Sequence, residues 1–272
     1  MKPLAHARTP PPAHGSRLST TNHPAGSGVV EQLVSFLAPG SAAADRYRAL
    51  RYSIEALRSE SGLPVIAVTS PSTGDGKTVT VLNIAGAFAQ AENARVLVID
   101  ADLRRPRLAT YLGLDNDRLP SLSRALRSSA CELGELVQRL EAFNLWVVPA
   151  GKPEPSPCEV LNSPLLPRLM REARRDFDCI LIDTPPVFLP DCRLIERWVD
   201  GFLMLVTAHK TPRKMLSEAL NELDPAKVFG LVFNGDDRAS TRYYGYYQYG
   251  ATEAEDPAVR RRRWWRPPSE TP

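Results

Sequence analysis

The sequence lacks several features that would assign its class at once. No segment approaches the roughly 20 consecutive apolar residues that a membrane-spanning helix needs, and the first 15 residues lack the apolar centre of a secretory signal. The four cysteines have neither CxxC spacing nor the density of a secreted disulfide scaffold. We therefore expect a cytoplasmic protein with reduced thiols.

The chain also lacks an excess of charge of one sign. Its 34 basic and 31 acidic residues give a net charge of +3, which is too close to neutral for a general polyanion binder, so nucleic acid is not an expected partner. Two features are overrepresented instead. The 25 prolines are about twice the usual share, and five of the eight tyrosines fall within residues 243–249.

The distribution of residue types predicts four parts. Residues 1–28 and 250–272 are rich in proline and charge and have the composition of disordered tails. Residues 29–242 have the composition and length of one sizeable α/β domain. Residues 243–249 form a tyrosine cluster between that domain and the second tail.

Within the central part, short apolar runs alternate with helical patterns. Strands are expected at 65–68, 95–99, 145–148, 179–182, 202–206 and 228–233. Helices are expected at 43–60, 78–92, 158–175 with breaks at Pro164 and Pro167, 193–199 and 212–223. Continuous apolar runs are typical of strands buried on both faces, so the sequence predicts an α/β fold with a mostly parallel sheet between two layers of helices. Ligands of such sheets bind at the carboxyl ends of the strands.

The first motif stands at the end of the strand at 65–68 and reads Thr69-Ser70-Pro71-Ser72-Thr73-Gly74-Asp75-Gly76-Lys77-Thr78. Gly-Lys-Thr between a buried strand and a helix predicts a phosphate-binding P-loop, in which Lys77 pairs with the β- and γ-phosphates and Thr78 ligates Mg²⁺. Pro71 replaces the usual first glycine. An ordinary turn with a lysine at the helix start is the alternative.

The second motif places Asp100 and Asp102 at the end of the strand at 95–99. Alternate side chains of an extended segment project the same way, so both carboxylates can reach one Mg²⁺-nucleotide site. Two like charges so close also raise one pKa, which suits a proton acceptor. Taken alone, the pattern also fits a solvated turn.

The third motif ends the strand at 179–182 with Asp183, followed by Thr184-Pro185-Pro186. A lone aspartate after an apolar strand is typical of the acid that orients the Mg²⁺ water shell opposite a P-loop. A helix N-cap is the alternative, but the two prolines disfavour a helix directly after Asp183. Together the three motifs predict a site for ATP and Mg²⁺.

These residues resemble the bacterial tyrosine kinases of exopolysaccharide and capsule export, a branch of the ParA/MinD-type P-loop ATPases. The resemblance spans most of residues 30–250 and rests on TSPSTGDGKT, VLVIDADLRRP, ILIDTPPV, VVPAGKPEPSPCEVL and the tyrosine cluster. ParA/MinD proteins proper carry a further lysine five residues before the P-loop lysine. That position is Ser72 here, which favours the kinase branch.

The resemblance implies transfer of the γ-phosphoryl group of ATP to tyrosines of an adjacent subunit. Lys77 would stabilise the charge of the transferred group, Asp100 would accept the tyrosine proton, and Thr78, Asp102 and Asp183 would hold Mg²⁺. The nucleotide would also contact the rest of the P-loop and a residue after the last strand, which gives the set Thr73, Gly74, Asp75, Gly76, Lys77, Thr78, Val79 and Asn234.

The tyrosine cluster is the acceptor that the resemblance implies, at Tyr243, Tyr244, Tyr246, Tyr247 and Tyr249. Tyrosines at this density beside glycines cannot all be buried, and each phosphate would add about −1.5 to −2 charge. An adhesive aromatic tail without chemistry is the alternative.

The resemblance also implies self-association in a ring through Asp45, Arg48 and Arg51, which lie near one face of a helix. A solvated helix face explains the same pattern. Further implied partners are a separate transmembrane activator of the polysaccharide co-polymerase type, which would recruit the protein to the inner face of the membrane, and a phosphotyrosine phosphatase. A basic tail at 260–266 with Trp264 and Trp265 is either a disordered end or an interfacial anchor.

Two other functions fit the same motifs. One is a ParA/MinD-like ATPase switch that controls assembly of a membrane complex and phosphorylates nothing. The other is a regulatory subunit that binds nucleotide without turnover, which the presence of the lysine and all three aspartates disfavours.

Overall fold

The computed structural model describes residues 19–20, 28–57, 65–128 and 130–236. Within them, one eight-stranded sheet has the order β1-β4-β5-β3-β6-β2-β7-β8, and all neighbours are parallel except β4 and β5. The strands are β1 (Ser19–Thr20), β2 (Val65–Thr69), β3 (Val96–Asp100), β4 (Gln138–Leu140), β5 (Leu145–Val148), β6 (Cys179–Asp183), β7 (Gly201–Thr207) and β8 (Val228–Asn234).

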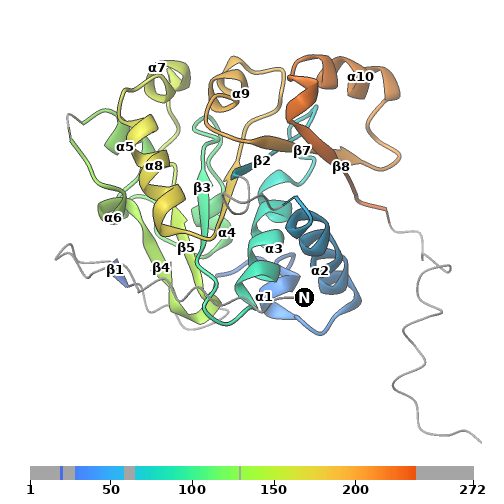
Figure 1. The fold of residues 1–272 in the computed structure, drawn as a ribbon, viewed down its shortest axis with the longest axis horizontal. Coiled ribbons are helices and arrows are strands. Elements are labelled where there is room, and N and C mark those ends of the chain that lie inside the picture. The colour runs from blue at the N-terminus through green and yellow to red at the C-terminus, as the bar shows by residue number, and fades with distance from the viewer. Residues whose placement is uncertain (1–18, 21–27, 58–64, 129, 237–272) are drawn as a thin grey trace, which may run out of the picture. The chain divides into compact units, whose positions relative to one another are not determined.

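Helices cover both faces of this sheet (Figure 1). Those packed on one face are α1 (Val34–Leu37), α2 (Ala42–Glu55), α3 (Lys77–Ala89) and α4 (Leu108–Tyr111). Those on the other are α5 (Leu122–Leu126), α6 (Leu133–Leu136), α7 (Pro157–Leu161), α8 (Leu166–Asp176), α9 (Pro190–Ile195) and α10 (Arg213–Asn221). Two 3₁₀ turns, η1 (Glu141–Phe143) and η2 (Pro225–Lys227), complete the described elements. The predicted three-layer α/β fold is confirmed.

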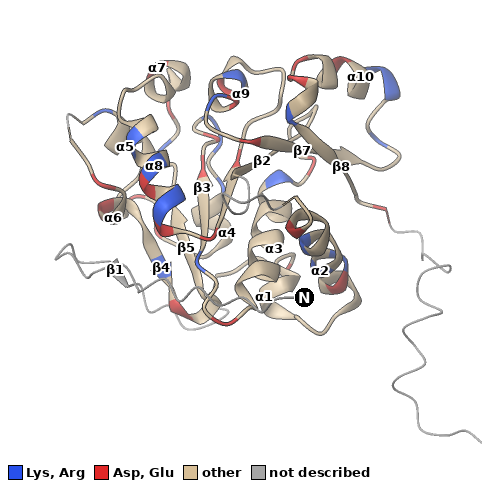
Figure 2. Ribbon diagram, in the orientation of Figure 1, with Lys and Arg blue, Asp and Glu red and all other residues tan. Residues whose placement is uncertain are grey.

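The central strands are apolar because both of their faces are covered. Every residue of β2, β3 and β6 is buried, as the continuous apolar runs predict. Side chains of β2 alternate between the two faces: Val65 and Ala67 belong to one apolar cluster, and Ile66 and Val68 belong to the other. Figure 2 shows acidic residues at the ends of β3 and β6, where the apolar runs stop.

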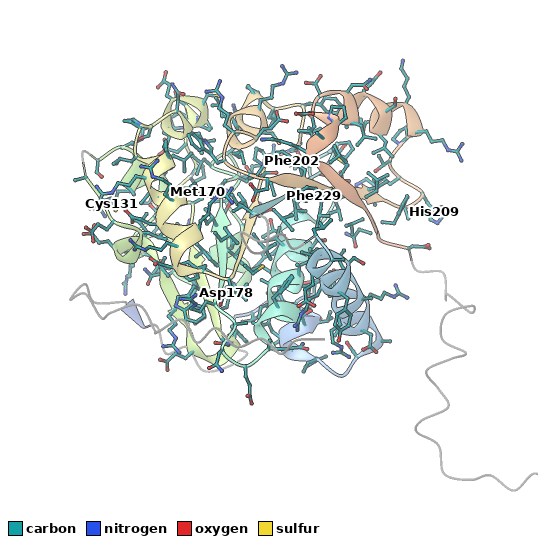
Figure 3. The ribbon with its side chains drawn as sticks, in the orientation of Figure 1. Cys131, Met170, Asp178, Phe202, His209 and Phe229 are labelled. Atoms are coloured by element: carbon teal, nitrogen blue, oxygen red, sulfur yellow. The ribbon has the colours of Figure 1, made fainter. Side chains whose placement is uncertain are left out.

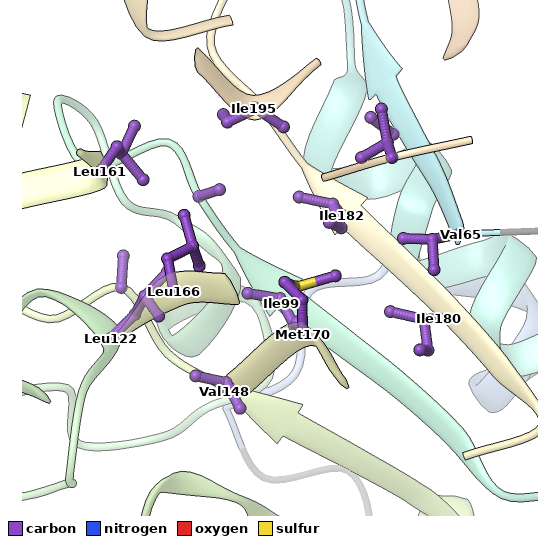
Figure 4. Packing of buried hydrophobic residues seen from close by; sticks show 14 of the residues in the cluster. Val65, Ile99, Leu122, Val148, Leu161, Leu166, Met170, Ile180, Ile182 and Ile195 are labelled. Atoms are coloured by element: carbon purple, nitrogen blue, oxygen red, sulfur yellow. The ribbon is translucent and has the colours of Figure 1, made fainter. Parts of the chain in front are cut away.

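The first apolar cluster packs α8 against the sheet (Figure 4). Leu166, Leu169, Met170 and Ala173 recur at helical spacing and are all buried, so this helix presents one apolar stripe to the strands. Cys179 lies in the opposite cluster, as expected of a core residue, and all four cysteines are free thiols.

Several elements differ from the sequence prediction. The break before α8 lies at residues 162–165, and Pro167 sits inside its first turn, where a missing N–H has no effect on the helix. The helix expected at 193–199 runs instead from Pro190 to Ile195, because Pro190 begins it rather than preventing it. Strand β4 was not predicted, since Gln-Arg-Leu carries no apolar pattern.

The structure describes only some of the residues at the predicted boundaries between tails and domain. The described residues up to Gly235 belong to one compact unit. Ser19 and Thr20, which fall in the segment predicted to be disordered, pair as β1 with β4. The remaining predictions for 1–18, 21–27 and 237–272 lie outside the described residues. Across the helices that are described, none combines the length and the apolarity that a bilayer crossing requires.

Strands β7 and β8 pack closely because a glycine leaves room for an aromatic ring between them. Gly201 begins β7, and a Cβ there would lie 2.5 Å from the ring of Phe229 in β8. Figure 3 labels Phe229 and the buried Phe202 on these two strands. The pairing continues to Thr207 and Asn234, which are opposite each other at the carboxyl end.

Gly86 tests the packing of α3 against α1. A Cβ on Gly86 would lie 2.8 Å from Cβ of Ser35 and 3.0 Å from the ring of Phe36. Helix propensity alone predicts that Gly86→Ala stabilises the protein by about 1 kcal/mol. We expect the opposite: a loss of about 1–3 kcal/mol from overpacking, seen as a lower midpoint in thermal unfolding.

The matched control is Gly230→Ala, because nothing lies within 4 Å of the Cβ that it adds. This variant should stay within about 0.5 kcal/mol of the parent. A Gly86→Ala protein as stable as the parent would contradict the close packing of α3.

Candidate functional site: the carboxyl edge of the sheet

The three sequence motifs end on three adjacent strands. β6 lies between β3 and β2, and its last residue, Asp183, is in register with Asp100 of β3 and Val68 of β2. Because parallel neighbours are about 4.8 Å apart, this register places the two aspartates side by side next to the loop that follows β2. The structure thus brings together segments that are more than 80 residues apart in sequence.

The loop between β2 and α3 has the backbone of a phosphate cradle. Gly74 and Gly76 have φ values of 83° and 94°, which favour glycine. A Cβ on Gly76 would lie 2.5 Å from Nδ2 of Asn234, so the loop backbone packs directly against the Asn234 side chain of β8. The amides at the start of the 13-residue helix α3 follow directly, at the positive end of its dipole.

Asp75 fixes this loop to the rest of the sheet. Its buried carboxylate accepts hydrogen bonds from the Ser72 amide at 2.9 Å and from the Thr207 hydroxyl of β7 at 2.8 Å. Nδ2 of Asn234 donates to the Asp75 carbonyl at 2.9 Å. Thr207 carried no motif signal in the sequence. Asn234 was predicted to contact adenine, and that role remains a prediction, since its amide here binds the loop.

Lys77 is buried at the first position of α3, with 7% of its surface exposed. Its Nζ donates to the Ser70 hydroxyl at 3.2 Å and to the Ser72 carbonyl at 3.3 Å, so the side chain curls back over the loop. Burial lowers the pKa of the ammonium, and the nearby carboxylates of Asp183 and Asp102 oppose that shift. An anionic ligand would therefore compensate the buried ammonium for the water that it has lost.

Asp183 and Thr78 form the tightest polar contact of the site. The Thr78 hydroxyl donates to Oδ2 of Asp183 at 2.6 Å, whereas the buried Oδ1 has no hydrogen-bond partner. The pKa of Asp183 is raised to about 7, chiefly by burial and also by the charge of Asp102, while the Thr78 hydroxyl and Lys77 oppose the shift. A buried carboxylate oxygen without a partner is a free acceptor for a cation.

Asp100, the predicted proton acceptor, is enclosed by protein in the structure. Its carboxylate is 1% exposed, and its two oxygens accept from the amides of Asp102 and Leu108, each at 3.2 Å. Burial, with the charge of Asp183, raises the pKa of Asp100 well above its ordinary value. These contacts order the segment after β3, and the role of Asp100 as the proton acceptor remains a prediction.

The donor set at this edge fits Mg²⁺. Asp102 is only half-buried, and its Oδ1 accepts from the Arg105 amide at 3.0 Å. The free Oδ1 of Asp183, the Thr78 hydroxyl and Asp102 are all oxygen donors. No cluster of three or more His, Cys, Asp or Glu side chains arranged for a metal occurs in the described part of the chain. That is expected for Mg²⁺, which takes one or two carboxylates and completes its shell with water and phosphate oxygens.

The segment after Asp102 is held by an ion pair that the sequence did not reveal. Arg104 donates from Nε and one NH2 group to the Asp191 carboxylate of α9 at 2.6 and 3.1 Å, and the Cys158 thiol of α7 donates to the same carboxylate at 2.8 Å. Asp191 is 1% exposed. The pair therefore ties the segment carrying Asp102 to the helix that follows β6.

The predicted self-association residues lie on α2, away from the three motifs. Arg48 pairs with Asp45 one turn earlier and also donates to the Pro39 carbonyl. Arg51 donates to the Ala87 carbonyl at the end of α3 at 3.0 Å and stacks over Phe88. Arg51 thus already joins two helices of its own chain, and the interface role of all three residues remains a prediction.

The other predicted positions divide into two groups. Thr73 is exposed on the loop, and Val79 is half-buried in the first turn of α3. The predicted acceptor tyrosines lie outside the described residues: Tyr243, Tyr244, Tyr246, Tyr247 and Tyr249.

Comparisons with known proteins agree with this geometry. Residues 66–238 match the family described as the CobQ/CobB/MinD/ParA nucleotide binding domain. The chain is 31% identical over 225 residues to the tyrosine-protein kinase YwqD of Bacillus subtilis, a match that covers 82% of this chain and 93% of YwqD. It is 33% identical over 204 residues to the tyrosine-protein kinase ptk of Acinetobacter johnsonii, which covers 74% of this chain but 27% of ptk.

A solved structure gives the same result. The kinase domain of the Escherichia coli tyrosine kinase ETK superposes with a TM-score of 0.70 and 27% identity, over 78% of this chain and 83% of that domain. The likeness therefore covers nearly all of YwqD, and the kinase domain alone where the relative is much longer.

The pKa of Asp183 predicts how stability depends on pH. The folded protein holds this proton up to about pH 7, whereas the unfolded chain releases it near 3.8. The free energy of unfolding therefore falls as the pH rises between these values. Without nucleotide, Asp183→Asn should unfold at a higher temperature than the parent at about pH 8, and the difference should shrink toward about pH 5. Thermal unfolding across this range measures it, and a pH-independent difference would contradict the assigned pKa.

The Arg104–Asp191 pair predicts a second stability change. Asp191→Asn leaves Arg104 without a countercharge and should lower the free energy of unfolding by about 1–3 kcal/mol. The control is Asp115→Asn, which breaks the exposed pair with Arg118 and should change it by less than about 0.5 kcal/mol. Denaturant unfolding compares the two, and equal effects would contradict the tie between these segments.

Proposed function

Since the chain belongs to the bacterial tyrosine kinases within the CobQ/CobB/MinD/ParA nucleotide-binding family, we propose that it transfers the γ-phosphoryl group of ATP to tyrosine side chains in the tail of an adjacent copy. One observation carries this proposal. Lys77, Thr78 and Asp183 meet at one edge of the sheet, where the Thr78 hydroxyl contacts a buried carboxylate whose second oxygen is free.

The proposed reaction needs little covalent chemistry from the protein. The tyrosine oxygen forms a bond to the γ-phosphorus, the bond from that phosphorus to the bridging oxygen breaks, and ADP leaves with the electron pair. The backbone of residues 73–78 holds the phosphates, and Lys77 neutralises charge on the transferred group. Mg²⁺, when bound by Thr78 and Asp183, would supply charge neutralisation of the phosphate oxygens.

We assign the tyrosine proton to Asp102. It is half-buried, and only one hydrogen bond from the Arg105 amide engages its carboxylate. Asp100, in contrast, is enclosed, and both of its oxygens accept hydrogen bonds from backbone amides. Arg104, held by Asp191, fixes the backbone on the far side of Asp102. Asp102 is therefore constrained from both sides while its side chain still reaches the open edge.

Ser72 supports the kinase over the ATPase switch. In the ParA/MinD proteins proper this position is the further lysine, but here its carbonyl accepts from Lys77 and its hydroxyl donates to Sδ of Met215 at 3.4 Å. The site thus lacks a second loop cation of that kind at Ser72. A role in exopolysaccharide or capsule polymerisation and export follows from the family.

The proposed function also involves an acceptor segment, a ring of copies and partner proteins. The acceptors would be the tyrosines at 243–249, which directly follow the domain in sequence. Copies would assemble as a ring through the α2 face that carries Asp45, Arg48 and Arg51. A transmembrane co-polymerase would recruit the protein from the cytoplasm to the inner face of the membrane, and a phosphatase would remove the phosphates.

Purified protein incubated with ATP and Mg²⁺ tests the reaction. We expect phosphotyrosine on the chain, detected by mass spectrometry, and its loss in Lys77→Met by at least about 100-fold, because the transferred charge loses its countercharge. Replacement of the five tail tyrosines by phenylalanine should remove the phosphate but keep nucleotide binding.

The outcomes separate the competing functions. ATP hydrolysis without phosphotyrosine would identify the ATPase switch instead. Undiminished phosphotyrosine in Lys77→Met would overturn the proposed reaction. Nucleotide binding without hydrolysis or transfer would identify a regulatory subunit.

A further inference from the structure

A group of exposed cations lies beside the proposed site and has no part in the chemistry described above. Lys210 in the loop after β7, and Arg213 and Lys214 in the first turn of α10, are all exposed. We call these three residues the β7–α10 basic surface. Within the described part of the chain, its one ion pair is a long contact of 3.9 Å between Lys214 and Glu218, with both side chains more than half exposed. Such a pair leaves the charges available.

Contacts at both ends of this segment place it next to the P-loop. Thr207, just before it, donates to the Asp75 carboxylate at 2.8 Å, and Met215, just after Lys214, accepts from the Ser72 hydroxyl at 3.4 Å. Ser72 in turn accepts from Lys77. Figure 2 shows the basic residues at the end of α10, and Figure 3 labels the exposed His209 at the start of this loop. The cations therefore stand at the rim of the site.

The sequence of the chain contains a segment of matching charge. Glu253, Glu255 and Asp256 follow the tyrosine cluster, and no basic residue lies between Tyr243 and Asp256. Glu253 is four positions after Tyr249, and Asp256 is seven positions after it. At about 3.3 Å per residue, an extended chain reaches roughly 13–23 Å over these intervals. A tyrosine placed at Lys77 would thus allow the acidic residues to reach the rim.

We propose that the β7–α10 basic surface binds the acidic segment 253–256 of a second copy and so guides the preceding tyrosines into the site. The proposal rests on the proposed kinase function and adds the way in which the substrate tail is recognised. Arg242 stands at the opposite end of the tyrosine cluster, where it would be repelled by the same cations.

Binding of a tail peptide tests this surface without any phosphoryl transfer. A fluorescein-labelled peptide of residues 240–257 is titrated with the full chain in the absence of ATP, and its anisotropy is followed. The patch variant Arg213→Glu with Lys214→Glu should weaken binding at least about tenfold. The matched control, Arg171→Glu with Arg175→Glu, makes the same charge change at two exposed positions of α8 and should stay within about twofold.

Charge exchange makes the test specific. A peptide carrying Glu253→Lys, Glu255→Lys and Asp256→Lys should bind the parent weakly and the patch variant well. The host chain keeps its own tail in every titration. Equal binding of the original peptide to parent and patch variant would overturn the proposal, as would weakened binding that the exchanged peptide does not restore. A patch variant that no longer binds phosphatidylserine vesicles, which the parent binds, but binds the peptide like the parent would also overturn the proposal. That result would identify the basic surface as a membrane-binding surface.

This design separates two failures. If the peptide binds as proposed but no phosphotyrosine forms with ATP, the kinase function fails and the docking surface stands. If phosphotyrosine forms and the patch variant binds the peptide like the parent, the docking surface fails and the kinase function stands.

Discussion

The parallel register of β3, β6 and β2 is the constraint on which the site depends. It fixes Asp100 beside Asp183 inside the protein and sets both next to the loop that carries Lys77. Burial raises the pKa of both carboxyl groups, and the charge of Asp183 raises that of Asp100 further. The site therefore holds an unfavourable arrangement of charge that a bound cation would relieve. The two apolar clusters that pack on either face of these strands stabilise the fold and offset the cost of burying the carboxyl groups.

The polar contacts around the edge have a division of labour. Asp75 fastens the P-loop to β7, and Asp191 fastens the segment after β3 through Arg104. Asp100 holds the backbone between them. Groups that would bind ligand are left less constrained: Oδ1 of Asp183 has no partner, and Asp102 is half-buried. A phosphoryl-transfer site requires rigid surroundings and carboxylate oxygens that are available to ligand, because its catalysis consists largely of positioning.

Much of this could be predicted from sequence, since the signals are local. The apolar runs that end in Asp100 and Asp183 predict two strands. A parallel sheet predicts that the carboxyl ends of these strands lie together at the ligand site. The rest depends on contacts between distant segments. Asp191 is a lone acid 87 residues from Arg104, and Thr207 is 132 residues from Asp75, so neither has a pattern. The enclosure of Asp100 could not be predicted either, because alternation along a strand does not reveal which of two carboxylates is buried.

The central claim is that one copy phosphorylates the tail of another, and mixing two chains tests it most directly. An active chain with its five tail tyrosines replaced by phenylalanine is combined with a ¹⁵N-labelled Lys77→Met chain that keeps its tyrosines, and ATP and Mg²⁺ are added. The account predicts phosphate on the heavy tail peptides, measured by mass spectrometry. Heavy tail peptides that remain unmodified, while the parent chain phosphorylates itself, would contradict it.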